Sequence, residues 1–135
     1  MKPLRARRDD GQATAFTVVM TVAILALAGL VLDAGLAVST KVEAVSAAQS
    51  AARAGARELD VAALRTSGVV RIDPAKARTA AQNWLNQARL TGTVSATGNQ
   101  VTVSVTTARQ TQLLHMLGVT SIPITATATA DAIVP

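Results

Sequence analysis

The chain has 135 residues, a formal net charge of +5, 1% aromatic residues and no cysteine. This length leaves room for one small domain, and the lack of cysteine excludes a disulfide framework and a thiolate metal site. The basic residues are not interleaved with aromatic ones, so the charge does not indicate nucleic-acid binding. Part of the charge lies in the head of the chain, at Lys2, Arg5, Arg7 and Arg8.

The first predicted element is an apolar helix. Residues 13–32 carry no charge, and as a helix about 20 residues long they span about 30 Å, the hydrocarbon thickness of a bilayer. The positive-inside rule then places the basic head in the cytoplasm. We therefore expect a cytoplasmic basic leader at residues 1–11, a transmembrane segment at 12–35 and an extracytoplasmic domain at 36–135. The run is longer than the core of an ordinary secretory signal.

Asp33 follows the apolar run directly. A carboxylate buried in lipid is costly and would mark a contact with a partner. At the end of a full span, the same side chain can instead sit in water at the outer interface, and this is the interpretation that its position favours.

The helix is expected to continue outside the membrane to about Leu59, because residues 34–59 are rich in Ala and contain no Pro. Small residues recur at intervals of four, which lets another backbone approach closely. Two interpretations follow, which can both hold on different faces: the helix packs lengthwise against copies of itself or its relatives, or its outer half lies on its own domain. The candidate helix-packing residues are Ala44, Ala47, Ala48, Ala51, Ala52, Gly55 and Ala56.

The next segments predict a loop and a second helix. Thr66, Ser67 and Gly68 indicate a loop. Asp73 and Pro74 form a helix start, with Asp as N-cap and Pro at the first helical position, and the helix continues to about residue 90.

The C-terminal third has the period of β-strands. Val101, Val103 and Val105 alternate with polar residues, and a turn before them predicts a hairpin between residues 93–96 and 101–107. A short helix follows in "RQTQLLHMLGV", ended by Gly118. The last strand contains Pro123, which suits an edge position or a strand start.

This last strand presents one face of small apolar residues: Ile122, Ile124, Ala126, Ala128 and Ala130. A sheet lined by Ala leaves space for a helix to lie close, and the Ala-rich part of the first helix is the natural occupant. The predicted fold is α+β and pilin-like: a long N-terminal transmembrane helix that continues outside the membrane, a second helix, and a three-stranded antiparallel sheet.

The sequence does not indicate an enzyme. It contains no phosphate-binding Gly-rich loop with Lys, no HExxH and no G-x-S-x-G, and it predicts no catalytic residue, metal or cofactor. His115 is the one histidine, and beside Leu and Met it is expected to be a half-buried packing residue. Trp84 is expected in the core. Arg53, Arg57 and Glu58 are expected to be solvated, although Glu58 could pair with an arginine of a neighbouring copy.

Three stretches together resemble a known family. They are "RRDDGQATAF" running into the apolar span and "GLVLDAGLAVSTKVEAVSAAQSAARAGARELD", then "VTVSVTT", then "LLHMLGVTSIPITATATA". In this order they resemble the TadE/TadG-like pseudopilins of Tad (tight adherence, Flp-type) pilus systems, in the form common in actinobacteria. Residues 60–92 are less characteristic.

The resemblance implies a minor pilin or assembly factor of a type IV-related pilus and secretion machine, anchored in the inner membrane. Implied partners are other pilin and pseudopilin subunits, a membrane platform, a cytoplasmic assembly ATPase and membrane lipid. It also implies a prepilin peptidase for members that carry a cleavage site. Gly11 fits that site and would leave Gln12 as the new N-terminus, but Phe16 stands at the fifth position, where processed pilins usually have Glu. A processed pilin and an uncleaved anchor both remain open.

An alternative function is a membrane-anchored extracytoplasmic binding module unrelated to pili. The threonines of "VTVSVTT" and "TATATA" could offer hydrogen bonds to a ligand from the exposed faces of the strands.

Overall fold

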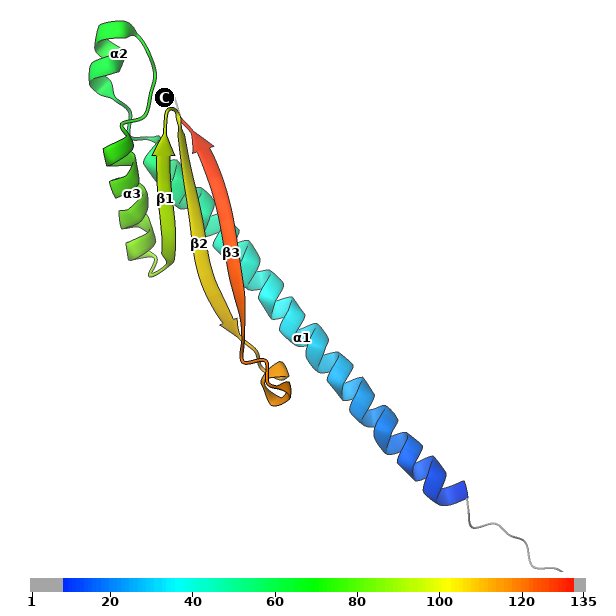
Figure 1. The fold of residues 1–135 in the computed structure, drawn as a ribbon. Coiled ribbons are helices and arrows are strands. Elements are labelled where there is room, and N and C mark those ends of the chain that lie inside the picture. The colour runs from blue at the N-terminus through cyan, green and yellow to red at the C-terminus, as the bar shows by residue number, and fades with distance from the viewer. Residues whose placement is uncertain (1–8, 133–135) are drawn as a thin grey trace, which may run out of the picture.

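The computed structural model describes residues 9–132, with the side chains described from residue 11. Its elements form a long helix with a small α+β domain on its C-terminal half (Figure 1). In chain order they are α1 (Asp9–Ala56), α2 (Val61–Ser67), α3 (Pro74–Gln87), β1 (Thr91–Thr97), β2 (Gln100–Gln110), the 3-10 helix η1 (Leu114–Leu117) and β3 (Ser121–Asp131).

Helix α1 is continuous from the apolar run into the domain, as predicted. It has 48 residues and at 1.5 Å per residue is about 72 Å long. No proline interrupts it, and two threonines in the apolar part return their hydroxyls to the preceding turn, Thr17 to Ala13 O at 2.9 Å and Thr21 to Thr17 O at 2.8 Å. It begins at Asp9 rather than Gln12 and ends at Ala56 rather than about Leu59. The N-terminal half projects beyond the domain (Figure 1).

The sheet is antiparallel with the strand order β1-β2-β3, which confirms the predicted three-stranded arrangement. The β1–β2 hairpin closes at Gly98 and Asn99, and the positive φ of 60° at Gly98 is the conformation that a two-residue hairpin turn needs at its first position. In the long β2–β3 pairing, Val103 lies opposite Ala128, and Pro123 lies on β3, an edge strand of the sheet.

Helices α1 and α3 cover one face of this sheet (Figure 1). Val101, Val103 and Val105 of β2 are fully buried beneath them, since the alternation of the strand sends every second side chain to that face. The predicted alanine-lined face of β3 is confirmed, with Ile124 and Ala126 buried and the other three members half-buried.

The helices approach closely because the contact residues are small. A Cβ added at Gly55 of α1 would lie 2.8 Å from the carbonyl oxygen of Ala77 in α3. The core therefore depends on close backbone approach rather than on large side chains; its largest fully buried side chains are Leu85 and the three valines of β2.

Two local predictions were wrong. Thr66 and Ser67 do not form a loop but end helix α2, which begins at an N-cap, Asp60, and stops at Gly68 with a left-handed φ of 66°. The short helix predicted from Arg109 is instead a continuation of β2 to Gln110, followed by one turn of 3-10 helix. Pairing with β3 decides this, because Arg109 and Gln110 lie in register with Ile122 and Ser121.

Candidate functional site

The candidate helix-packing residues lie on the face of α1 that the chain's own domain covers. Five of the alanines are buried together with Gly55 against the sheet and α3, and Ala47 is half-buried. Of the two interpretations that the sequence left open, the structure shows that this part of the helix lies on its own domain. The buried members are Ala44, Ala48, Ala51, Ala52, Gly55 and Ala56.

A different face of α1 is left open. Val31, Gly35, Val38 and Val42 recur at intervals of three and four residues, so they share one side of the helix. Val38 and Val42 are 64% and 63% exposed, and a Cβ added at Gly35 would meet nothing within 4 Å. We call these four residues the open stripe of α1. It continues the apolar surface of the membrane segment into the region beside the domain.

Asp33 joins the end of the apolar run to the C-terminal part of the chain. Its carboxylate accepts hydrogen bonds from the backbone N–H groups of Gln112 (2.8 Å), Leu113 (3.1 Å) and Leu114 (2.8 Å). The residue is only 3% exposed. The prediction that Asp33 sits in water was therefore wrong: it contacts the segment that leads into η1, where three N–H groups at a helix start would otherwise lack acceptors.

The same segment packs on the helix one turn earlier. A Cβ added at Gly29 would lie 2.9 Å from the side chain of Leu113. Glycine at position 29 is thus what lets the segment lie against α1, and together with Asp33 it fixes where the domain meets the membrane half of the helix.

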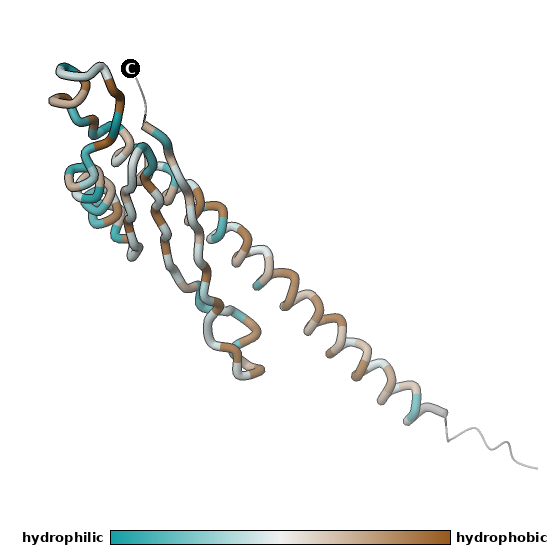
Figure 2. The backbone as a smooth tube through the Cα atoms, turned by 45° about the horizontal axis from the view of Figure 1, so that its top comes forward, coloured by the Kyte–Doolittle hydropathy of each residue, from teal (hydrophilic) through white to brown (hydrophobic). Residues whose placement is uncertain are grey.

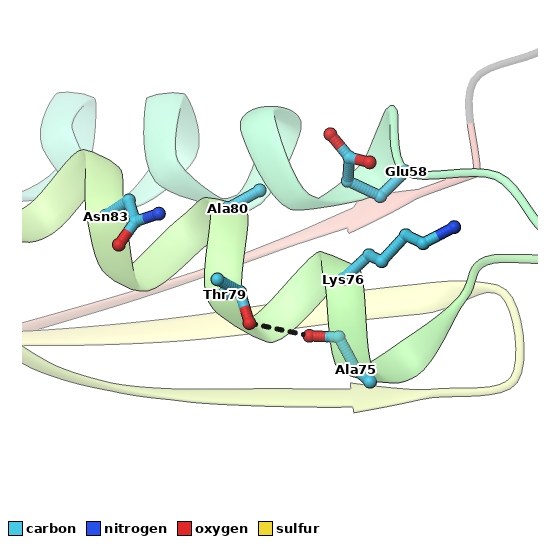
Figure 3. Close-up of a pocket in the computed structure, with 6 residues that line it drawn as sticks. All are labelled: Glu58, Ala75, Lys76, Thr79, Ala80 and Asn83. Carbon is cyan, nitrogen blue, oxygen red and sulfur yellow. Dashed lines mark hydrogen bonds between the residues drawn. The ribbon is translucent and has the colours of Figure 1, made fainter.

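The described residues form shallow hollows on the surface of the domain. One hollow, between α3 and the end of α1, is lined by Glu58, Lys76, Thr79, Asn83 and two alanines; Glu58 and Lys76 lie on its two sides (Figure 3). The hydroxyl of Thr79 donates to the carbonyl oxygen of Ala75, and Lys76 forms an ion pair with Asp73 at 3.4 Å. No group of three or more potential metal ligands occurs within residues 9–132.

The perturbed carboxylates of the domain act as helix caps. The backbone N–H of Ala63 and the guanidinium of Arg71 lower the pKa of Asp60, the N-cap of α2. The backbone N–H groups of Lys76 and Ala75, with the Lys76 ammonium, lower the pKa of Asp73, the N-cap of α3. Each carboxylate stabilises a helix start, so these shifts have a structural cause.

The polar face of the sheet pairs with itself. The hydroxyls of Thr102 and Thr129 are 3.0 Å apart, and those of Ser104 and Thr127 are 2.9 Å apart. These contacts join β2 to β3 as cross-strand pairs. Four of the hydroxyls proposed for a ligand in the binding-module alternative, those of Thr102, Ser104, Thr127 and Thr129, thus already have partners within the chain.

The predicted processing residues, Gly11 and Gln12, lie exposed near the start of α1. The basic residues at positions 2, 5, 7 and 8 lie outside the described residues, so the structure does not bear on their cytoplasmic location.

One single-residue prediction is corrected, one is refined and one is confirmed. His115 is exposed rather than half-buried, and its Nδ1 lies 2.8 Å from the carbonyl oxygen of Gln112. Trp84 packs against the core but is itself half-buried, while its neighbour Leu85 is fully buried. Arg53 is exposed, with its guanidinium 3.4 Å from the side-chain oxygen of Gln49.

Comparison with protein families gives one match. Residues 11–58 match the family described as "Putative Flp pilus-assembly TadE/G-like". The predicted family is thereby confirmed over the segment that comprises nearly all of α1 and the start of the following connection, while its actinobacterial form stays a prediction. Comparisons with curated proteins and with solved structures gave no significant match. Of the described helices, α1 is the one long and apolar enough to cross a membrane.

Proposed function

We propose that this protein, whose residues 11–58 belong to the TadE/G-like Flp pilus-assembly family, is a minor pilin or pseudopilin that acts through helix packing. The single observation that carries the proposal is that the matched segment is the rod α1, whose open stripe is covered by nothing in the described chain. A pilus-related role follows from the family; the role of a packed subunit is the finer step proposed here.

The proposed topology follows the charge and apolar pattern. Residues 1–11 are the cytoplasmic leader, residues 12–35 cross the cytoplasmic membrane once, and residues 36–135 form the pilin-like domain outside. Most of the apolar half of α1 projects free of the domain, and Figure 2 shows hydrophobic residues along it up to the level where the domain begins. That surface needs lipid or a protein partner.

The proposed contact with other subunits uses the open stripe rather than the alanines named from the sequence. Five of those alanines are already buried against the sheet and α3, so they have no surface left for a second helix. The open stripe offers three valines and a glycine at helical spacing, a surface on which another apolar helix can lie closely. Partners of this kind are other pilin and pseudopilin subunits, with the membrane platform of the apparatus beneath them.

The test is a paired arginine substitution in the native pilus system. Val38→Arg with Val42→Arg should keep membrane insertion and the folded domain but lose co-purification with the other pilins of the system. The control is Val61→Arg with Val69→Arg, two exposed valines at the opposite end of the molecule, which should retain it. Undiminished co-purification of the first variant would contradict packing through the open stripe.

Processing is tested separately by intact-mass analysis of the protein from its own host. A mass lacking residues 1–11 would establish cleavage after Gly11 and hence prepilin-peptidase recognition. A mass that includes them would establish an uncleaved anchor, and packing through the open stripe is compatible with either result.

A further inference from the structure

We infer that the segment 111–120, here called the η1 loop, dips into the outer leaflet of the membrane and forms a second lipid contact beside the transmembrane helix. This inference rests on the proposed single-pass anchor and goes beyond it. The occupant of the surface is the apolar region of a lipid bilayer, just below its headgroups.

The η1 loop exposes large apolar side chains. Met116 and Leu117 are 77% and 76% exposed, and Leu113 and Val119 are close to half exposed. The sequence of the segment, TQLLHMLGVT, contains no Asp, Glu, Lys or Arg. Such a concentration of apolar surface on a chain of this size marks a contact with a partner or a membrane.

The position of the loop identifies lipid as that partner. Leu113 packs at Gly29 and the backbone of residues 112–114 binds Asp33, so the loop lies beside the last turn of the apolar run. Figure 1 shows η1 at the lower end of the sheet, where the free half of α1 begins. Leu30, Val31 and Leu32, at the same level of α1, are exposed as well. A bilayer that covers the helix up to Leu32 therefore also meets the loop.

Most backbone N–H groups of the η1 loop are already hydrogen-bonded, as a poorly hydrated environment requires. A polar group without a partner in such a place costs free energy. Asp33 accepts from three consecutive N–H groups, and the N–H groups of Met116, Gly118 and Val119 donate to carbonyl oxygens inside the loop at 3.0–3.2 Å. The N–H of Thr111 donates to Thr120 O across its base. The three hydrogen bonds to Asp33 also account for a buried carboxylate at the boundary.

Basic side chains lie above the loop, on the side toward the domain. Arg109 is exposed at the end of β2, and Lys41, two turns beyond Asp33 on α1, donates to the carbonyl oxygen of Thr125. Long basic side chains at this level reach lipid headgroups while apolar groups below them enter the leaflet.

The experiment uses the absence of cysteine from the chain. Leu117→Cys carries a nitroxide label in the full-length protein, reconstituted in vesicles of phosphatidylethanolamine and phosphatidylglycerol. The experiment measures how often the label collides with oxygen, which concentrates in lipid, and with a nickel chelate, which stays in water. The ratio of the two collision rates reports the depth of the label. Val22→Cys serves as the reference within the span and Asn99→Cys, in the far hairpin turn, as the reference in water. All three positions are exposed, so the label should not disturb the fold.

The expected result is an oxygen-to-nickel ratio at position 117 several-fold above that at position 99 and in the direction of position 22. A ratio at 117 equal to that at 99, with 22 in lipid, would overturn the inference and leave the anchor intact. A label at 117 shielded from both reagents would mean that a second copy covers the loop, which also overturns it. An aqueous ratio at 22 would overturn the proposed anchor itself.

Discussion

Asp33 and Leu114 are held together although 81 residues separate them: Oδ2 of Asp33 in α1 accepts a 2.8 Å hydrogen bond from the backbone N–H of Leu114 at the start of η1. With the bonds from Gln112 and Leu113, this contact fixes the C-terminal segment at the point where α1 leaves the domain. The relationship sets where along α1 the domain begins.

Replacing Asp33 should free the η1 loop. In Asp33→Ala the three N–H groups lose their acceptor, so amide hydrogen exchange in residues 111–120 should become on the order of tenfold faster. Hydrogen-exchange mass spectrometry of the reconstituted protein measures this directly. Asp131→Ala is the matched control, since its carboxylate is exposed and binds Gln100 at the opposite end of the sheet. Equal exchange in the wild type and Asp33→Ala would show that the contact does not hold the loop.

Enlarging a buried alanine of α1 should damage the domain and not only its assembly. Ala48 is 0% exposed, and Leu at this position would have to displace the sheet, which typically costs about 1–3 kcal/mol. Denaturant unfolding in micelles should show this loss for Ala48→Leu, while Gln49→Leu, exposed on the next position, should stay close to the wild type. A stable Ala48→Leu protein that merely failed to bind its partners would restore the interpretation first suggested by the alanine spacing.

Two glycines of the same helix should respond in opposite directions to alanine. Gly55→Ala places a Cβ 2.8 Å from the carbonyl oxygen of Ala77 and should lower stability by about 1–3 kcal/mol, because α1 and α3 must separate. Gly35→Ala meets nothing within 4 Å and should gain up to about 1 kcal/mol from helix propensity. Thermal unfolding of both variants is the measurement, and loss of stability in Gly35→Ala alone would contradict the described packing.

The caps of α2 and α3 should make stability depend on acid. The pKa values of Asp60 and Asp73 are lowered in the folded state, so their contribution is fully present above the unfolded pKa of about 3.9 and disappears as the pH falls through the lower folded values. The double variant Asp60→Asn, Asp73→Asn should therefore have a lower melting temperature than the wild type at pH 7. The difference in melting temperature should narrow below about pH 4. Glu43→Gln, an exposed carboxylate on α1, controls for net charge. If the difference in melting temperature between the wild type and the double variant stayed constant from pH 7 to pH 2, the two carboxylates would not be the source of the acid dependence.

Sequence patterns over a few neighbouring residues predicted an element correctly where local interactions alone decide its structure. The Val alternation of β2 and the Asp73-Pro74 start of α3 appear in the structure as predicted. Helix α2 was missed although its signals are of the same local kind, an Asp N-cap at residue 60 and a Gly stop at residue 68. The local sequence could not predict the length of β2, because pairing with β3 holds Arg109 and Gln110 in the strand.

The contact of Asp33 had no sequence signature. Its partners are backbone N–H groups, which every residue but proline carries. The residue types at positions 112–114 therefore give no sign of the hydrogen bonds. The apolar residues of η1 can be read from the sequence. Their position beside the apolar run of α1, at Gly29, could be known only from the tertiary structure.

The sequence by itself determined the apolar span, the unbroken helix that extends it and the α+β domain, because propensity and periodicity act over a few residues. Only the tertiary structure decided which face of α1 the domain occupies and which it leaves open. Small residues spaced by four admit a neighbouring backbone equally well whether it belongs to the same chain or another. Here the chain's own Ala-lined sheet lies in that place, and the stripe that includes Val38 and Val42 is what remains.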